Sequence, residues 1–346
     1  MTDVLSLDPG ELGALVAELG APAFRGRQLF QALWRDRLED WEALRAWPQA
    51  LRVEAARRWP LRRLRVVRTQ TARDGTAKLL VRLADGEQVE TVVLPHPYGW
   101  SVCVSTEVGC AMGCRFCASG LRGKVRRLTA GEMLDQVSLA DAEARRAGAR
   151  ITRIDLMGVG EPLDNYDATV RFLRLAHDPL GFGIAYRRMT VSTSGLVPRI
   201  LRLADEGLPV TLAVSLHAPD DALRSRLMPV NRAYPVQAVL DAARTYFART
   251  GRRVTFEYLL IAGVNDGDET ARRLAARLRG LAAHVNLIPW NPVPEFPYQP
   301  SPPERVRAFR AILEAARIPC TVRKELGQEI AAACGQLRSA AEGQGT

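Results

Sequence analysis

Lysine, histidine and long apolar runs are all scarce in this chain of 346 residues. Its positive charge is almost all arginine, since lysine stands only at Lys78, Lys124 and Lys324. No apolar stretch reaches the length that crosses a bilayer, and the opening residues lack the basic and apolar regions of a secretory signal. These absences predict a cytoplasmic protein without a membrane partner.

The composition is that of a large globular protein with a basic balance. Hydrophobic residues make up 47% and charged residues 25%, and the length suffices for a barrel with an accessory domain. The net charge of +10 favours a polyanionic partner such as nucleic acid, because clustered cations release counterions from phosphates. A basic surface that is merely solvated explains the composition equally well.

Three cysteines form the most informative motif of the chain. Cys110, Cys114 and Cys117 are separated by gaps of three and two residues. A [4Fe–4S] cluster normally takes four cysteine thiolates, so a cluster held by three keeps one iron open. An open iron can chelate the amino and carboxylate groups of S-adenosylmethionine and deliver an electron to its sulfonium. The motif therefore predicts one [4Fe–4S] cluster with S-adenosylmethionine bound beside it.

Structural zinc is the alternative for the same cysteines. Zinc sites of this kind use four ligands, usually as two Cys pairs or with histidine. No second pair follows, and only Cys103, seven residues upstream, could complete a local set. The spacing of the triplet favours iron and sulfur, and six cysteines in such a chain suit ligands and reactive thiols better than a disulfide framework.

Periodicity divides the first part of the chain into two predicted units. Apolar residues at helical spacing predict an N-terminal helical accessory domain over residues 1–60. Its arginines make it the candidate RNA-contacting domain. Over residues 61–98 the spacing of apolar residues changes from the helical period to the shorter period of a strand, on both sides of the turn pair Asp85-Gly86. This pattern predicts a hairpin in a small β module. Thr129 with Glu132 and Ser301 with Glu304 predict capped helix starts, and the polar tail over 339–346 is expected to be disordered.

Strand and helix patterns alternate over residues 99–338, which predicts parallel βα units. We expect an α/β fold with an open, partial (βα)6 barrel, smaller than a closed barrel of eight units. Glycines and polar residues follow the strands, at the ends where such barrels carry their sites. The candidate strands cover residues 101–105, 151–157, 189–192, 210–216, 254–261 and 284–288.

With these motifs in view, the chain resembles the radical-SAM adenine-C2 methyltransferases of ribosomal and transfer RNA over residues 10–338. The resemblance implies a radical-SAM barrel and a methyl transfer to C2 of adenine in 23S ribosomal RNA, with transfer RNA as a second candidate substrate. Beside the cysteine loop it rests on Met157-Gly-Val-Gly-Glu-Pro-Leu-Asp-Asn165, Ser192-Thr-Ser-Gly-Leu-Val-Pro198, Ser215-Leu-His-Ala218, Arg226-Leu-Met-Pro-Val-Asn-Arg232 and Ala332-Ala-Cys-Gly-Gln-Leu337.

A radical route is needed because C2 of adenine is electron-poor and cannot attack a sulfonium methyl. The resemblance implies that one S-adenosylmethionine methylates Cys334 by displacement, and that a second is cleaved at the cluster to a radical that takes hydrogen from this methyl group. Each turnover therefore uses two S-adenosylmethionine molecules. After addition to the base, Cys103 attacks the Cys334 sulfur to release the RNA and leaves a disulfide, and Glu90 is the implied proton acceptor.

The same resemblance implies the cofactor contacts and the partners. From the residues alone Glu90 is only a strand-surface carboxylate, and Cys320 is interpreted as a small buried hydrophobe. A reduced flavodoxin- or ferredoxin-like protein is the implied electron donor, and we expect a monomer. The implied S-adenosylmethionine contacts are Gly160, Glu161, Ser192, Ser215, Leu216, His217 and Asn286.

Two residues after the cysteine loop depart from the family pattern. Lys124 replaces an apolar residue and Arg127 replaces asparagine. Either change would alter how the target base is held, or would add contacts to RNA phosphates.

Three alternatives stay open beside the C2 activity. They are the relatives that methylate C8 of the same adenine, a paralogue with a different RNA substrate, and an iron–sulfur RNA-binding protein without turnover. The residues Ser192-Thr-Ser-Gly195 and Gly160-Glu-Pro162 favour C2 over C8. A binding protein has no need of the thiol pair Cys103 and Cys334.

Overall fold

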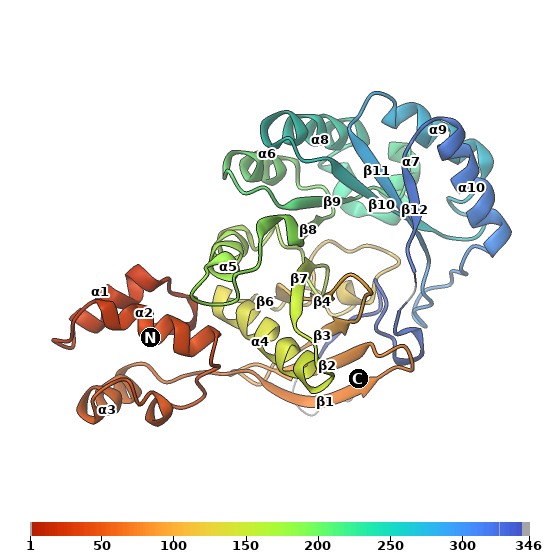
Figure 1. Cartoon of the computed structure of the whole chain (residues 1–346). Helices are drawn as coiled ribbons and strands as arrows, with labels where there is room; N and C mark the ends of the chain where they lie inside the picture. Colours follow the sequence, from red (N-terminus) through yellow and green to blue (C-terminus); the bar gives the residue numbers. More distant parts are fainter. Residues whose placement is uncertain (1, 325, 341–346) are drawn as a thin grey trace.

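The structure is a computed structural model that describes residues 2–324 and 326–340 (Figure 1). Parallel strands lie side by side in its centre, in the order in which they follow one another along the chain. All six strands predicted from the sequence are present, and a short strand after them extends the sheet. They are β4 (Trp100–Cys103), β7 (Ile151–Leu156), β8 (Met189–Thr193), β9 (Thr211–Ser215), β10 (Val254–Leu260), β11 (Ala283–Pro289) and the added β12 (Cys320–Val322).

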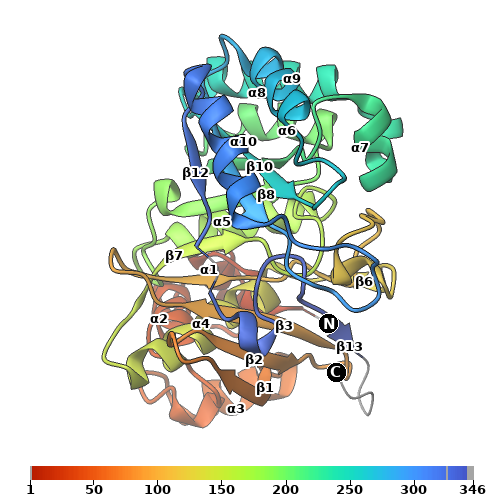
Figure 2. The same ribbon diagram turned by 90° about the vertical axis from the view of Figure 1, so that its right-hand side faces the viewer.

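Helices follow these strands and cover the outer face of the curved sheet, as the two ribbon views show (Figures 1 and 2). Strand residues such as Val191, Val214 and Leu287 are fully buried in the core. The fold is therefore the α/β partial barrel expected from the sequence. The helices are α4 (Ala130–Arg146), α5 (Tyr166–His177), α6 (Val197–Asp205), α7 (Asp221–Leu227), α8 (Val236–Thr250), α9 (Asp268–Leu278) and α10 (Pro303–Ala315).

One of the two predicted helix caps is confirmed and the other is wrong. At α4 the Thr129 hydroxyl accepts from Glu132 N at 3.1 Å, and the Glu132 carboxylate accepts from Thr129 N at 2.9 Å. At α10 the cap position is taken by Pro302, one residue after the predicted Ser301. The serine hydroxyl instead donates to Asp266 Oδ2 at 2.8 Å, a charge-assisted bond to a distant part of the chain.

The N-terminal helices are η1 (Val4–Ser6), α1 (Pro9–Ala17), α2 (Phe24–Trp34), η2 (Trp41–Ala43) and α3 (Gln49–Arg58). They form a lobe beside the barrel (Figure 1). Two glycines let α1 and α2 touch, since a Cβ on Gly26 would lie 2.2 Å from the Gly13 nitrogen. Leu12, Phe30 and Leu33 are fully buried, so the apolar stripes of this segment form its core.

The predicted hairpin is present, but its strands belong to the sheet of the barrel. They are β1 (Arg65–Thr71), β2 (Ala77–Arg82) and β3 (Gln88–Leu94), and β3 pairs antiparallel with β4. A further strand, β13 (Ser339–Ala340), pairs with β3, so the first two residues of the predicted disordered tail are ordered by sheet pairing. Residues 341–346 of that tail lie outside the described residues. The division of the chain at residues 60, 98 and 338 stays a prediction.

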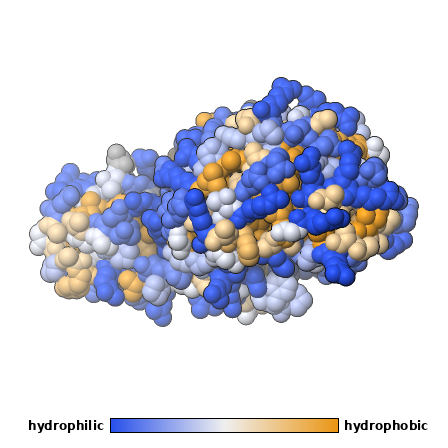
Figure 3. Space-filling model, turned by 90° about the horizontal axis from the view of Figure 1, so that it is seen from above, coloured by the Kyte–Doolittle hydropathy of each residue, from blue (hydrophilic) through white to orange (hydrophobic). Residues whose placement is uncertain are grey.

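Seen from above, the surface is mostly hydrophilic, and hydrophobic residues show in patches between charged ones (Figure 3). Exposed large apolar residues such as Phe24, Val53 and Tyr98 are ordinary for a folded surface. Among residues 2–324 and 326–340, no helix combines the length and the apolar character needed to cross a membrane.

A buried ion pair joins the helical lobe to the barrel. Arg63 donates to Asp135 Oδ1 of α4 at 2.9 Å and to the carbonyl oxygens of Leu33 and Leu38 at 2.7 and 2.9 Å. The second carboxylate oxygen of Asp135 accepts from Leu64 N at 2.7 Å. Because both charged side chains are buried and bonded on several sides, each depends on the other.

Replacing Asp135→Ala is expected to lower the free energy of unfolding by about 3–5 kcal/mol, because Arg63 would stay buried without its counter-charge. Urea unfolding followed by circular dichroism measures the change. The control Glu314→Ala removes an exposed pair with Arg310 and should cost at most about 0.5 kcal/mol. Equal losses of unfolding free energy in the two variants would contradict the larger contribution expected of the buried ion pair.

Candidate active site

A cavity lies at the carboxyl ends of the parallel strands, where this type of barrel places its active site. Its walls come from the loop after β7, from the ends of β8 to β11 and from the predicted cluster loop. Cys334 lines the same cavity, although it is more than two hundred residues away from that loop in sequence. The predicted site residues that line the cavity are Cys110, Cys114, Cys117, Cys334, Gly160, Glu161, Ser192, Ser215 and His217.

The cysteine loop is closed at its base and packed against the Cys334 segment. Strands β5 (Glu107–Val108) and β6 (Arg126–Arg127) pair at the two ends of the loop. They approach closely, since a Cβ on Gly109 would lie 1.7 Å from the Gly123 carbonyl oxygen. Ala118 N donates to the Gly335 carbonyl at 2.7 Å, which ties the loop to the residue after Cys334.

Burial sets the protonation of the three loop thiols. It raises the pKa of Cys110 to about 12, and it also raises the pKa values of Cys114 and Cys117. Such thiols stay neutral until a cation compensates for the thiolate charge. In the described part of the chain, no three His, Cys, Asp or Glu side chains converge on a point where one bare metal ion could bind. Three thiols that line one cavity and need a positively charged partner fit an iron–sulfur cluster.

Glu161 connects the loops after β7 and β8. Its carboxylate is buried and accepts from Ser194 N at 2.7 Å and from Leu163 N at 3.1 Å. Its own backbone N donates to Glu107 Oε2 at 3.0 Å. Beside these bonds the buried Ser194 hydroxyl has no protein partner. A polar atom of this kind on a cavity wall is available to a ligand.

Arg224 joins the ends of β8 and β9 from behind the cavity. This fully buried guanidinium donates to the carbonyl oxygens of Ser194, Ser215 and Leu216 at 2.6, 3.0 and 3.1 Å. His217, which follows Leu216 in the chain, has a φ of +58°, and its Nδ1 accepts a hydrogen bond from the backbone N–H of Leu259. Burial lowers the pKa of His217 to about 3, so its imidazole is neutral in the cavity wall.

Two predicted cofactor contacts do not line the cavity. Leu216 is buried with its carbonyl bonded to Arg224, and Asn286 donates to Glu257 Oε2 at 2.9 Å behind the wall. Asn291, which the sequence analysis did not select, lies closer to the chemistry and donates from Nδ2 to the Cys334 carbonyl at 3.2 Å. Its position in the loop directly after β11 was the signal that could have found it.

Cys103 and Glu90 lie behind the Cys334 segment. Cys103 is buried with Ala332 and Leu337, and burial and then the neighbouring Cys334 thiol raise its pKa. Glu90 is only 2% exposed, ion-paired with Lys78 Nζ at 2.8 Å, and accepts from a backbone N–H after Cys334. The interpretation of Glu90 as a strand-surface carboxylate is therefore wrong, because Lys78 and the backbone that leads into β13, which pairs with the edge of β3, enclose its carboxylate.

Comparisons with known proteins agree with this geometry. Residues 104–275 match the family model described as the radical SAM superfamily. The chain is 54% identical over 96% of its length to a protein of Symbiobacterium thermophilum named probable dual-specificity RNA methyltransferase RlmN, of which it covers 90%. Its identity to the protein of the same name in Geobacillus kaustophilus is 45%, over 98% of this chain and 93% of that one. The chain belongs to the RlmN family of radical SAM RNA methyltransferases.

A solved structure agrees with this assignment over the whole chain. The crystal structure of a radical SAM methyltransferase from Sphaerobacter thermophilus has a TM-score of 0.95 to this fold at 50% identity. The match covers 98% of this chain and 99% of that one, the helical lobe included.

The residues present fit the cofactors of an RlmN enzyme, a [4Fe–4S] cluster and S-adenosylmethionine. Cys110, Cys114 and Cys117 supply thiols that need a positively charged partner. Next to them, Gly160 lets the cavity wall pack closely against Thr106 and Glu107, and the Ser194 hydroxyl is buried without a partner. The cavity thus offers ligands for the cluster and an unfilled polar wall for the cofactor.

Lys124 and Arg127, the two departures from the family pattern, are paired inside the protein. Lys124 Nζ is hydrogen bonded to Asp164 and lies 3.8 Å from Glu107 Oε1, and Arg127 is 3.0 Å from Asp164 Oδ1. Glu107 also accepts from the backbone N of Glu161. The two cations therefore have partners within the protein, but their side chains are 27% and 53% exposed and are also available to RNA phosphates.

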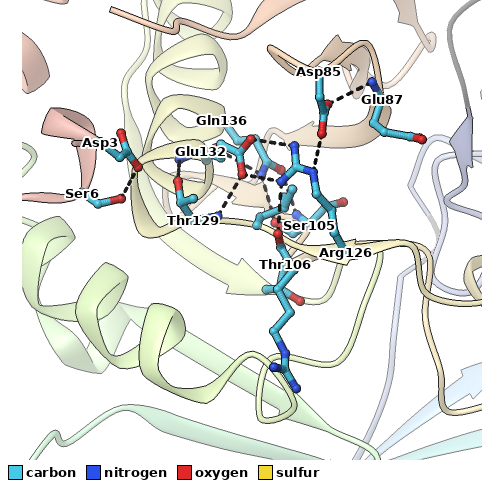
Figure 4. A network of polar contacts seen from close by, with 12 residues as sticks. Asp3, Ser6, Asp85, Glu87, Ser105, Thr106, Arg126, Thr129, Glu132 and Gln136 are labelled. Atoms are coloured by element: carbon cyan, nitrogen blue, oxygen red, sulfur yellow. Dashed lines mark hydrogen bonds and ion pairs between the residues drawn. The ribbon is translucent and has the colours of Figure 1, made fainter. Parts of the chain in front are cut away.

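The neighbouring Arg126 points toward Asp85 and Glu132, as Figure 4 shows. Its guanidinium donates to both carboxylate oxygens of Glu132 at 2.8 and 2.9 Å and to Asp85 Oδ2 at 2.5 Å. Glu132 is the capping residue of α4, and Asp85 lies in the turn between β2 and β3. Arg126 thus anchors the end of the cysteine loop to the barrel and to the β extension.

Replacing Gly160→Ala is expected to weaken S-adenosylmethionine binding by at least about tenfold, since backbone strain alone is worth about 1–3 kcal/mol. Gly160 has a φ of +110°, and its Cβ would lie 2.7 Å from Glu107 Cβ and Thr106 Oγ1. Equilibrium dialysis of the reconstituted protein measures the affinity. In the control Gly148→Ala, the residue has a φ of +73° and lies in open space away from the cavity, so S-adenosylmethionine affinity should be unchanged. An equal loss there would mean that positive-φ strain anywhere in the chain causes the effect, and not the place of Gly160 in the cavity wall.

Replacing Glu107→Gln is expected to flatten the decline of stability between pH 6 and 8. Burial, and then a hydrogen bond to Asp164, raise the pKa of Glu107 to about 8. A carboxyl group whose pKa is higher in the folded than in the unfolded protein contributes its full stability below the unfolded pKa. This contribution is lost as the pH rises through the folded pKa, here on the order of 1 kcal/mol per pH unit. Thermal midpoints across this range measure it. The exposed control Glu269→Gln should follow the wild type, and a Glu107→Gln profile parallel to both would refute the raised pKa.

Proposed function

We propose that this RNA methyltransferase places its methyl group on C2 of adenine 2503 in 23S ribosomal RNA and of adenine 37 in transfer RNA. The relatives named above are dual-specificity RNA methyltransferases, which supports two RNA substrates. The observation that carries the proposal is that Cys334 shares one cavity with the three cysteines of the predicted cluster loop. A methyl-carrying thiol has to be within reach of the cofactor that methylates it.

The bound cluster and S-adenosylmethionine supply an electrophilic methyl group and, after one-electron reduction by a flavodoxin- or ferredoxin-like donor, a hydrogen-abstracting radical. Two S-adenosylmethionine molecules are used in each turnover. The chain orients them: Gly160 holds the loop after β7 against Thr106 and Glu107, Ser194 offers its hydroxyl, and neutral His217 completes the wall. The Cys334 sulfur faces this wall and accepts the methyl group.

Cys103 is proposed to release the RNA. Once the carbon on Cys334 is bonded to the base, Cys103 loses its proton and attacks the Cys334 sulfur. The carbon–sulfur bond breaks with its electron pair on the carbon, which takes up a proton to become the methyl group, and a Cys103–Cys334 disulfide remains for reductants to open. The packing of Cys103 against the Cys334 segment supports this role. Its burial also keeps it from other oxidants until the RNA is bound.

Glu90 is proposed as the proton acceptor on structural grounds as well as by family membership. It lies on the same face of β3 as Val92, which pairs with Cys103. Its carboxylate accepts from Arg338 N at 2.8 Å, four residues after Cys334. Lys78 holds the Glu90 carboxylate at this place.

We propose that the enzyme acts as a monomer in the cytoplasm, where its RNA substrates are found.

Methylation by reconstituted enzyme tests the proposal. With S-adenosylmethionine, dithionite and unmodified 23S ribosomal RNA or transfer RNA, we expect 2-methyladenosine from wild type. Cys334→Ala should give none, because no thiol carries the methyl, and Cys103→Ala should accumulate an RNA–protein adduct that denaturing electrophoresis detects. Cys320→Ala, in β12, is the matched control and should keep wild-type activity.

The products separate the alternatives. Detection of 8-methyladenosine would overturn the C2 assignment and leave the cysteine chemistry intact. Methyl on Cys334 without any methylated RNA would point to a different RNA substrate. A wild-type enzyme that carries no methyl on Cys334 would overturn the mechanism.

A further inference from the structure

A second cavity, called the side cavity below, lies next to the candidate active site. It has a volume of about 860 Å³ and opens between the loop after β11, the start of α10 and the end of β12. Figure 2 shows α10 and β12 side by side at this place. Trp290 and Arg323 line both cavities, so the two sites adjoin. The proposed methyl transfer makes no use of the side cavity.

The segment that carries Cys334 separates the two cavities. Cys334 lines the first, and Gln336, two residues later, lines the side cavity and donates from Nε2 to the Pro292 carbonyl oxygen at 2.9 Å. Asn291 lines the side cavity from the loop after β11 and donates from Nδ2 to the Cys334 carbonyl oxygen at 3.2 Å. These bonds fix the shared wall. A base that reaches the Cys334 sulfur therefore brings its neighbouring nucleotide to the side cavity.

The side cavity is basic. Its charged lining residues are Arg307 on α10 and Arg323 after β12, and no Asp or Glu is among the described residues that line it. Arg307 is exposed, and none of the ion pairs formed within residues 2–324 and 326–340 involves it. A cation without a carboxylate partner can bind a phosphate without giving up another bond. The charge of the side cavity thus complements a nucleic-acid backbone.

The other walls suit a single base. Oδ1 of Asn291 is buried without a partner in the described chain, and a donor on a bound base would supply one. Bases that proteins read one at a time are unpaired and pack against protein side chains. A cavity of this size holds a small ligand and excludes a duplex. Exposed apolar surface comes from Pro300, Pro302, Pro303 and Val322.

We infer that the side cavity binds the unpaired nucleotide next to the target adenine, with the phosphate of this nucleotide on Arg307 and its base against the proline and valine surface. The inference rests on the proposed RNA substrates and adds a binding site to the proposed function. A folded electron-donor protein fits the side cavity less well. The recess has the size of a small ligand, and none of the three cluster-loop cysteines lines it.

Changes of charge in the side cavity test the site. Reconstituted enzyme is titrated with fluorescein-labelled stem-loop RNAs that carry adenine 2503 or adenine 37, and anisotropy gives the dissociation constant at several salt concentrations. Val322→Glu should weaken binding about tenfold, whereas Val322→Lys should bind at least as tightly as wild type. Arg307→Gln should weaken binding about fivefold and lower the slope of log affinity against log salt by about 0.7, as expected for one lost contact to a single strand.

Controls separate RNA binding from assembly of the active site. Arg244→Gln removes an exposed arginine of α8 and should leave affinity and salt slope unchanged. Methylation of Cys334 by S-adenosylmethionine without RNA should keep its wild-type rate in every variant, because none of the replaced side chains lines the first cavity. A stem-loop with 4-thiouridine beside the target adenine should crosslink on irradiation to peptides that contain Arg307 or Val322, and a stem-loop with the label in its stem should not.

Unchanged RNA affinity and salt slope in both Val322→Glu and Arg307→Gln would overturn the inference. So would equal weakening by Val322→Lys and Val322→Glu, since charge would then not be the cause. Slower reduction of the cluster by flavodoxin, with RNA binding intact, would assign the side cavity to the electron donor instead. Failure of the proposed function looks different: the variants would alter RNA binding as described, yet the wild type would form no 2-methyladenosine.

Discussion

The backbone of Ser194 is held from both sides by buried side chains of opposite charge. Its N–H donates to the Glu161 carboxylate, and its carbonyl accepts from the Arg224 guanidinium. Each charge is expensive to bury, and each is compensated by several hydrogen bonds to backbone groups. Because Glu161 belongs to the loop after β7 and Arg224 reaches β9, this one residue fixes three strand ends relative to one another. The wall of the cavity that these strand ends form depends on that arrangement.

Packing of distant segments then brings the thiols together. The cysteine loop precedes α4, whereas Cys334 comes almost at the end of the described chain. The bonds from Ala118 N to the Gly335 carbonyl and from Asn291 Nδ2 to the Cys334 carbonyl hold the backbone of the second segment against the first. With both neighbouring carbonyls fixed, the Cys334 sulfur can change its environment mainly by rotation of its side chain. A short movement of that kind suits the role proposed for Cys334, in which its sulfur would serve the cofactor, the base and Cys103 in turn.

Sequence patterns predicted what is local, and they missed what depends on distant contacts. The six strands follow from period and composition, and the triplet at Cys110, Cys114 and Cys117 follows from its spacing. Glu90 looked like a surface carboxylate because its alternating strand gives no sign that Lys78 and Arg338 N will enclose it once residues 339–340 pair with the edge of β3. The burial of Arg224 was hidden for the same reason, since arginine is usually exposed and its acceptors come from three separate segments.

Lys124 and Arg127 show how a departure from a family pattern can be compensated within the fold. Two cations in place of neutral residues would be costly beside a cavity that already binds a positively charged sulfonium. The Asp164 carboxylate is ion-paired with both cations, and its neighbour Glu107 accepts from the backbone of Glu161. One carboxylate thus compensates two charges beside the loop that carries Glu161. Because both basic side chains stay partly exposed, they are also available to RNA phosphates.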